Sequence, residues 1–442
     1  MLSRRFLGSC FVWIACSAIL GAAPILKVEP AADGKNAKIQ VFPSKTDVPC
    51  LLDLVDAKTG VCIATLHAGT ATSGQTFSLG KIPFLKPGGY TVRFREGISI
   101  TPDLDVKLQK KEKWINPRDI VINSKGVYVY DSGFATIQPE KKEDGTVPEP
   151  IPGKGSNYVY RFTRDGQPDA KFADRGRATL WEEPRAVNSF DVDDEGIIYV
   201  TTLGHEATAF DSSGNAMNMT FGGWDNDPNG PKGTGWVNCV AVGHQHRLYI
   251  YTGYSNMKVY DRTKNAFEGI MYMYAGMGSY KNGGRPITAD RKGAIYHITP
   301  DDRVQRFDDT GTEIKPSYES GSEAKMCTPM GLNASAGLIW VVDHGPSVGP
   351  FWDTGGDTGV MLFWDSGAGI HFVDRYGAPG KAADKLEFIH PSAVAQSPEH
   401  TEIWVVEDGM PCKLEDSPPG NARVRRFKIT ATQTDELPLE LK

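Results

Sequence analysis

The alternation of hydrophobic and polar positions follows one unit that recurs along the chain. In residues 190–211, FDVDDEGIIYVTTLGHEATAFD, an alternating segment leads into a polar cluster ending in Gly196, then a β-branched and aromatic run, then a third apolar segment. Period-two alternation predicts strands, and a polar cluster ending in glycine predicts the turn between them. The unit therefore predicts three strands whose hydrophobic faces need neighbouring copies to cover them.

Six copies of this unit align on an aromatic residue inside the second predicted strand: Tyr128, Tyr199, Tyr249, Tyr296, Trp340 and Trp404. The third predicted strand of each copy also ends in an aromatic residue: Phe162, Phe210, Tyr260, Phe307, Phe363 and Phe427. All-β units repeated at this spacing are typical of propellers. We therefore predict an all-β protein whose main part is a six-bladed β-propeller.

The repeat consensus combines an apolar strand, a D/N-x-x-G turn, an IYV-like strand and a last strand of the form R-x-x-x-F-D. This consensus resembles the NHL repeat over residues 114–430. The resemblance implies the propeller fold and says almost nothing about activity, because propellers carry many unrelated functions.

The chain has 442 residues, which suits two domains better than one core. Residues 25–97 hold five predicted strands and form a small β-sandwich in this prediction, with the propeller at 114–432. The runs DAKTGVCIATLHAG and LKPGGYTVRF resemble the immunoglobulin-like sandwich of exported bacterial proteins, including flagellar hook-capping proteins. That resemblance implies spacing, docking or plain stabilisation. Residues 98–113 are predicted to be a linker, in which DVKLQKK is a candidate outer strand for the last blade.

Residues 1–22 have the pattern of a signal peptide, with a basic start, an apolar core and small residues at the end. We therefore expect a secreted or periplasmic protein with no membrane span in the mature chain. A retained anchor or lipidation at Cys16 are the alternatives; the apolar run is short for a span. The net charge of −6 and the lack of long basic runs argue against nucleic-acid partners and anionic membranes.

The chain has seven cysteines, of which five follow the leader. Cys50 and Cys62 flank a turn at 56–60, and the register of that hairpin places Cys62 opposite Leu54 rather than Cys50. An offset of four residues along a strand is about 13 Å, too far for a disulfide. We therefore predict that all five are reduced or buried.

The connection between the second and third predicted strands is short in copies 2, 3 and 4 and long in copies 1, 5 and 6. Copies 5, 6 and 1 become neighbours when a propeller closes, so their insertions are predicted to share one face. Three residues after the key aromatic, these copies carry Asp131, Asp343 and Glu407. Adjacent carboxylates suit a hard divalent cation, with calcium favoured over zinc because the ligands are oxygens. The alternative is that each acid caps the turn after its strand.

Aromatic and histidine side chains near this face are candidate ligand-binding residues: Phe351, Trp352, His344, Trp224 and His205. Exposed rings beside carboxylates often hold sugars or apolar ligand groups. His205, His297 and His344 have unequal offsets from the key aromatic, which argues against a matched histidine metal site, and His297 is expected to point into its sheet. His244, His246 and His400 are expected in solvated turns of the opposite face.

No G-x-S-x-G, H-E-x-x-H, P-loop or dinucleotide fingerprint occurs in the sequence. The prediction is an exported recognition protein that binds a glycan, peptide or protein partner on its insertion-bearing face. The alternative is a metal-assisted lyase, lactonase or other hydrolase acting at the central opening. No catalytic residue is assigned, and a divalent cation is the one cofactor that the sequence suggests.

Overall fold

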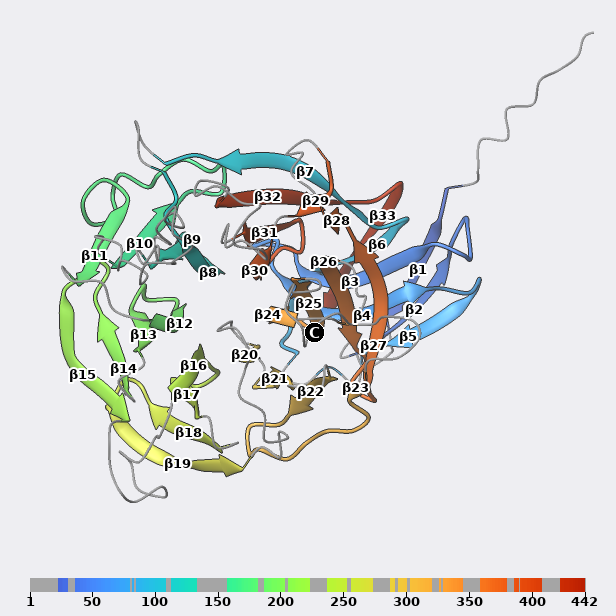
Figure 1. Cartoon of the computed structure of the whole chain (residues 1–442). Helices are drawn as coiled ribbons and strands as arrows, with labels where there is room; N and C mark the ends of the chain where they lie inside the picture. Colours follow the sequence, from blue (N-terminus) through green and yellow to red (C-terminus); the bar gives the residue numbers. More distant parts are fainter. Residues whose placement is uncertain are drawn as a thin grey trace, which may run out of the picture.

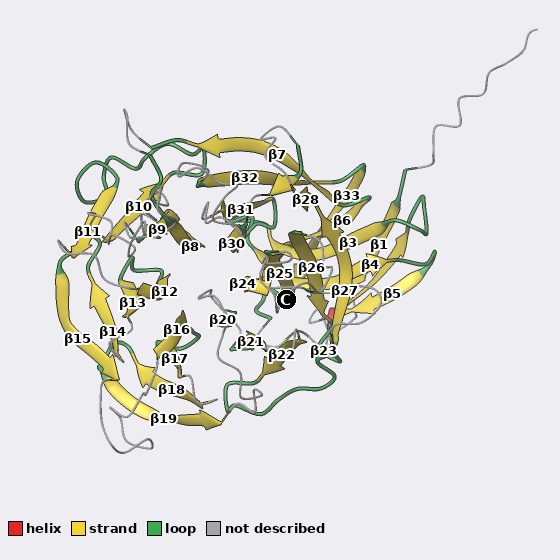
Figure 2. Cartoon of the chain, viewed as in Figure 1, coloured by secondary structure: helices red, strands yellow, loops and turns green. Residues whose placement is uncertain are grey.

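The computed structural model describes residues 23–30, 36–79, 82, 85–108, 113–132, 157–181, 187–202, 206–222, 237–252, 256–272, 287–290, 293–299, 303–319, 326, 329–344, 358–379, 385–388, 390–407 and 422–441. Strands and turns make up almost all of this part of the chain (Figure 2). The prediction of an all-β protein is confirmed. Within the described ranges, no helix is long and apolar enough to cross a membrane.

Each repeat copy forms a four-stranded antiparallel sheet, numbered here in the order of the copies. Sheet 1 contains β8 (Pro117–Asn123), β9 (Gly126–Asp131), β10 (Asn157–Phe162) and β11 (Arg177–Trp181). Sheet 2 contains β12 (Val187–Val192), β13 (Ile198–Thr202), β14 (Glu206–Phe210) and β15 (Ala216–Gly222). Sheet 3 contains β16 (Val237–Val242), β17 (Arg247–Thr252), β18 (Asn256–Asp261) and β19 (Ala266–Tyr272).

The remaining three sheets follow the same order. Sheet 4 contains β20 (Ile287–Ala289), β21 (Ile295–Ile298), β22 (Arg303–Phe307) and β23 (Tyr318–Glu319). Sheet 5 contains β24 (Pro329–Ser335), β25 (Leu338–Asp343), β26 (Gly359–Asp365) and β27 (Ile370–Tyr376). Sheet 6 contains β30 (Pro391–Gln396), β31 (Glu402–Glu407), β32 (Arg423–Thr430) and β7 (Ser99–Val106). Between sheets 5 and 6, β28 (Ala378–Pro379) and β29 (Glu387–Phe388) form a short parallel pair.

These sheets lie around a ring with the first strand of each at the centre (Figure 1), which is the arrangement of a β-propeller. The aromatic residues used to align the copies lie on the second strand of each sheet and are at most 2% exposed. Hydrophobic clusters fill the spaces between neighbouring sheets. One of them joins Ile120 and Val127 of sheet 1 to Trp404 of sheet 6, so the ring is closed by packing as well as by pairing.

The outer strand of sheet 6 comes from the N-terminal side of the chain. β7 pairs antiparallel with β32, with Val106 opposite Val424 and Ser99 opposite Thr430. The sequence placed a candidate strand at 105–111, whereas the structure has it at Ser99–Val106. The alternation in SITPDLDV, where Ile100 and Val106 are buried, provides a face that packs on the sheet.

The N-terminal unit consists of two sheets with a common hydrophobic core. One sheet contains β1 (Ile25–Pro30), β2 (Ala37–Phe42) and β5 (Gln75–Ser78). The other contains β33 (Gln433–Leu441), β6 (Gly88–Glu96), β3 (Pro49–Asp56) and β4 (Cys62–Thr70). The C-terminal strand β33 was not predicted, and it adds Leu439 and Leu441 to this core. The unit therefore extends beyond residues 25–97.

The pairing of β3 with β4 keeps Cys50 and Cys62 apart, as the sequence predicted. Cys50 is opposite Gly69, and a bulge places Cys62 opposite Val55, one residue from the expected Leu54. Cys50, Cys62 and Cys239 are buried and are not joined in disulfides. The absence of a Cys50–Cys62 disulfide is thus confirmed, while Cys327 and Cys412 lie outside the described residues.

Candidate functional site

The acidic residues predicted to mark the binding face occupy equivalent strand ends. Asp131, Asp343 and Glu407 are the last residues of β9, β25 and β31. Each lies opposite a proline that begins the first strand, and the register shifts directly after that proline: Pro117↔Asp131, Pro329↔Asp343 and Pro391↔Glu407. Thr202 and Thr252 hold the same register position in sheets 2 and 3. The copies are therefore equivalent residue by residue at this edge of the ring. We call this edge, marked by Asp131, Asp343 and Glu407, the rim.

The carboxylate of Asp131 is completely buried and accepts two backbone hydrogen bonds. The N–H of Ile115 donates to Oδ2 at 2.9 Å, and the N–H of Asn116 donates to Oδ1 at 2.8 Å. The chain that enters sheet 1 is thus fastened to the end of β9. These hydrogen bonds go to the segment before β8 and not to the turn after β9, so the turn-capping alternative stays a prediction.

Asp343 and Glu407 are paired with arginines of their own sheets, on β27 in sheet 5 and on β32 in sheet 6. Asp343 Oδ2 lies 3.2 Å from Arg375 Nη2. Glu407 accepts a two-pronged contact from Arg423, 2.9 Å at each oxygen, and its Oε1 lies 3.5 Å from Arg425 Nη1. Both acids are completely buried, so these guanidinium groups supply the charge compensation that a buried carboxylate requires.

The arginines around Glu407 also position the chain that leads into sheet 6. Arg423 Nη2 and Arg425 Nη1 donate to the carbonyl of Glu387 at 3.0 and 2.7 Å, and Arg425 Nη2 donates to the carbonyl of Lys385 at 2.8 Å. Burial lowers the pKa of Arg425 from its ordinary value. Glu407 thus stabilises two cations that hold the 385–387 segment against the ring.

The three predicted metal ligands are not brought into one tight cluster. In the described part of the chain, a single set of three His, Cys, Asp or Glu side chains has potential ligand atoms within 4.8 Å of one another, and none of the rim acids belongs to it. The shared cation at Asp131, Asp343 and Glu407 stays a prediction. Each of these acids meanwhile has a hydrogen-bonding or ionic partner within the protein.

His344 follows Asp343 directly and pairs with a histidine that the sequence did not single out. Its ring centroid lies 4.4 Å from that of His390, which directly precedes Pro391 and β30. Burial, the charge of His390 when protonated and the nearby guanidinium of Arg118 lower the pKa of His344 from 6.5 to about 3. The imidazole is therefore neutral at physiological pH, and its Nδ1 has no hydrogen-bond partner among the described residues.

His344, His390 and Arg118 come from sheet 5, the entry to sheet 6 and the start of sheet 1. Arg118 follows Pro117, so both missed residues adjoin the proline that begins a first strand. The repeated proline at this position was the available signal. It was not used because the sequence alignment started from the second strand.

Four predicted ligand-binding residues, Phe351, Trp352, Trp224 and His205, lie outside the described residues. His297 is completely buried, with Nδ1 3.3 Å from Gln305 Oε1 and its ring 5.1 Å from that of Tyr251, so it packs within the sheets as expected. His246 is exposed. His400 is completely buried instead of solvated, because the N-terminal unit covers its turn.

No family model matches the sequence, and no curated protein matches it. Among solved structures, the chain is similar to virginiamycin B lyase from Staphylococcus aureus, with 13% identity over 74% of this chain and 99% of that chain and a TM-score of 0.40. It is also similar to a chain of the Mitotic Checkpoint Complex, with 11% identity over 75% of this chain and 92% of that chain and a TM-score of 0.41. Neither likeness carries an argument about activity or partners, and the fold assignment rests on the sheets themselves.

Proposed function

We propose that this protein is an exported recognition protein, a six-bladed propeller with a small N-terminal sandwich, that binds a glycan, peptide or protein on its insertion-bearing face. The leader pattern in residues 1–22 supports a secreted or periplasmic location. One observation carries the proposal: the three longest connections start at equivalent strand ends of three neighbouring sheets, next to the half-buried pair His344 and His390.

The polar groups at this place suit recognition better than general packing. A neutral imidazole whose Nδ1 has no partner among the described residues can accept a hydrogen bond from a hydroxyl or amide of a ligand. Binding sites combine a few polar groups of this kind with apolar and aromatic walls. Phe351 and Trp352, in the insertion that follows His344, would supply such a wall.

A panel of oligosaccharides and a random peptide library, screened against the full chain, test this proposal. We expect a bound class of glycan or peptide whose affinity falls at least tenfold in a variant carrying His344→Ala and His390→Ala. The matched control is His246→Ala. His246 is exposed in the turn between β16 and β17, at the end of sheet 3 away from the rim, and this variant should bind normally. Equal binding by all three proteins would place recognition on another surface.

The second candidate is a metal-assisted lyase or hydrolase at the central opening. It is favoured by the two adjacent imidazoles of His344 and His390, because neutral imidazole is a common ligand of catalytic metals. If a cation binds the rim acids, calcium is expected, and it should raise the melting temperature of the parent protein but not of a variant with Asp343→Asn and Glu407→Gln. An unchanged melting temperature with millimolar calcium would exclude this cation.

A further inference from the structure

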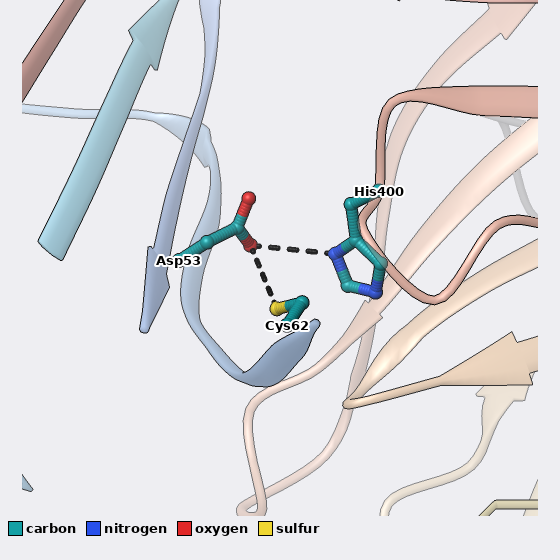
Figure 3. Close-up of side chains that lie close together, drawn as sticks. All are labelled: Asp53, Cys62 and His400. Carbon is teal, nitrogen blue, oxygen red and sulfur yellow. Dashed lines mark hydrogen bonds and ion pairs between the residues drawn. The ribbon is translucent and has the colours of Figure 1, made fainter. Parts of the chain in front are cut away.

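A separate cluster of polar side chains lies where the N-terminal unit meets the ring (Figure 3). Asp53 comes from β3, Cys62 begins β4, and His400 lies in the turn between β30 and β31. Their exposed fractions are 0%, 5% and 0%. These are the side chains whose potential metal-ligand atoms all lie within 4.8 Å of one another in the described part of the chain.

Backbone contacts between the two bodies hold the cluster in place. The N–H of Cys62 donates to the carbonyl of Pro398 at 2.8 Å, and the N–H of Thr65 donates to the carbonyl of Ala336 at 2.8 Å. Arg95 Nη1 donates to the carbonyl of His400 at 2.7 Å. The side chains are therefore positioned by both bodies before any ligand binds.

The carboxylate of Asp53 directs one oxygen toward the other two residues. Its Oδ2 lies 2.6 Å from Arg95 Nη2. Its Oδ1 accepts hydrogen bonds from Thr65 Oγ1 at 2.9 Å and from Cys62 Sγ at 3.6 Å, and it lies 3.5 Å from His400 Nδ1. A carboxylate oxygen has two lone pairs, so the one that accepts the thiol proton of Cys62 becomes available to a cation when that proton leaves.

His400 Nδ1 faces this oxygen at 3.5 Å, an ionic contact when the imidazole is protonated (Figure 3). A separation of 3.5 Å exceeds the usual N–H···O range of about 2.7–3.2 Å. Neither ring nitrogen has a hydrogen-bond partner in the described residues. A completely buried imidazole in this situation is costly, because buried polar groups nearly always have a partner.

We propose that Asp53 Oδ1, Cys62 Sγ and His400 Nδ1 bind a zinc ion that joins the N-terminal unit to the ring. With Zn–O of about 2.1 Å, Zn–N of about 2.05 Å and Zn–S of about 2.3 Å, a tetrahedral ion separates O from N by about 3.4 Å and O from S by about 3.6 Å. The two distances here are 3.5 and 3.6 Å. One thiolate, one imidazole and one carboxylate form a donor set typical of zinc.

The charges around the cluster also suit a dication. The guanidinium of Arg95, 2.6 Å from Asp53 Oδ2, favours the ionised form of this buried carboxyl. Zinc binding displaces the proton of the Cys62 thiol to solvent, and the resulting thiolate and the carboxylate balance the charge of the ion. Arg95 and Thr65 then act as outer partners that orient the carboxylate. Three protein donors leave the fourth position of zinc for a small ligand such as water.

The full chain is produced in zinc-supplemented medium and purified. Its zinc content is then measured by inductively coupled plasma mass spectrometry. We expect an equimolar amount of zinc in the parent protein and a loss of at least tenfold in Cys62→Ala. Cys50→Ala, which removes another buried thiol of the same sheet, is the matched control and should retain the metal. Retention of zinc by Cys62→Ala would overturn the proposal.

Cobalt replacement provides a measurement that does not depend on the folding of a variant. The parent protein, stripped with a chelator and titrated with cobalt, should show tetrahedral d–d absorption together with a sulfur-to-cobalt charge-transfer band. The predicted rim cation would have oxygen ligands and no such band, so this spectrum separates the two sites. Absence of the charge-transfer band in the folded parent protein would disprove the site, whatever the outcome for the rim.

Discussion

At the scale of single residues, the buried acids at the rim are stabilised by partners in their own sheets or in the segment that leads into them. Asp131 receives backbone N–H groups, while Asp343 and Glu407 receive arginines. His344 differs from them because it is half-buried and its buried Nδ1 has no hydrogen-bond partner among the described residues. Buried groups of this kind are concentrated at functional sites, and the neutral imidazole is therefore the residue we associate with ligand binding.

The stability of the protein should depend on pH through His344. Its pKa is about 3 in the folded state against 6.5 ordinarily, so below about pH 6.5 the unfolded chain binds a proton that the folded chain does not. Stability is therefore lost as the pH falls from about 6.5 toward 3, by roughly 2–3 kcal/mol at pH 4. Urea unfolding of His344→Gln at pH 7 and pH 4 should show this loss reduced, with exposed His371→Gln as control. A parent-like loss in His344→Gln would contradict the prediction.

At the scale of elements, the N-terminal unit and the propeller ring each contain one strand from the other's part of the chain. β7 leaves the N-terminal unit to complete sheet 6, and β33 leaves sheet 6 to complete the N-terminal unit (Figure 1). Arg95 opposite Thr434 and Val92 opposite Leu437 show β33 paired along the length of β6. Both additions remove an exposed sheet edge, which otherwise invites pairing with another chain.

The unpredicted strand β33 should contribute to the core and not only to the edge. Leu439 is 3% exposed and lies in the core of the N-terminal unit, whereas the adjacent Glu440 is exposed. Leu439→Ala is expected to lower the free energy of unfolding by about 2–4 kcal/mol, and Glu440→Ala by no more than about 0.5 kcal/mol. Chemical denaturation measures both. Equal effects of the two substitutions would mean that β33 is not held in this core.

At the scale of the whole molecule, the two bodies are joined by strands, packing and buried polar contacts together. One hydrophobic cluster combines Leu51 and Ala68 of the N-terminal unit with Trp340 of sheet 5 and Val405 of sheet 6. The buried contact between Arg95 and Asp53 is also part of this joint. Such an interface resembles the interior of one domain more than a contact between two mobile domains.

The N-terminal unit and the ring should therefore unfold together. Each body loses a strand when the other unfolds, so neither retains a complete sheet on its own. Differential scanning calorimetry of the full chain is expected to show one transition whose calorimetric and van't Hoff enthalpies agree. Two resolved transitions, or a calorimetric enthalpy near twice the van't Hoff value, would show independent domains.

Local alternation determined the strands inside each copy. The segment AKIQVF was predicted as a strand and is β2, Ala37–Phe42, and the key aromatic residues lie on the second strands. The rim acids could be placed at equivalent positions for the same reason, since the register within a short hairpin follows from its turn and its buried face. His390 and Arg118 were missed because the copies were aligned on the second strand, whereas both residues adjoin the proline that begins a first strand.

By itself, the sequence determined an all-β chain of repeated strands, the equivalent positions of Asp131, Asp343 and Glu407, and the separation of Cys50 from Cys62. The tertiary structure alone decided that β33 joins β6, that His400 is buried and that Asp53, Cys62 and His400 meet. The physical reason is that alternation records which face of a strand is buried, but the backbone hydrogen bonds that join distant strands are the same for every sequence. Partners hundreds of residues apart are therefore chosen by the packing of the complete molecule.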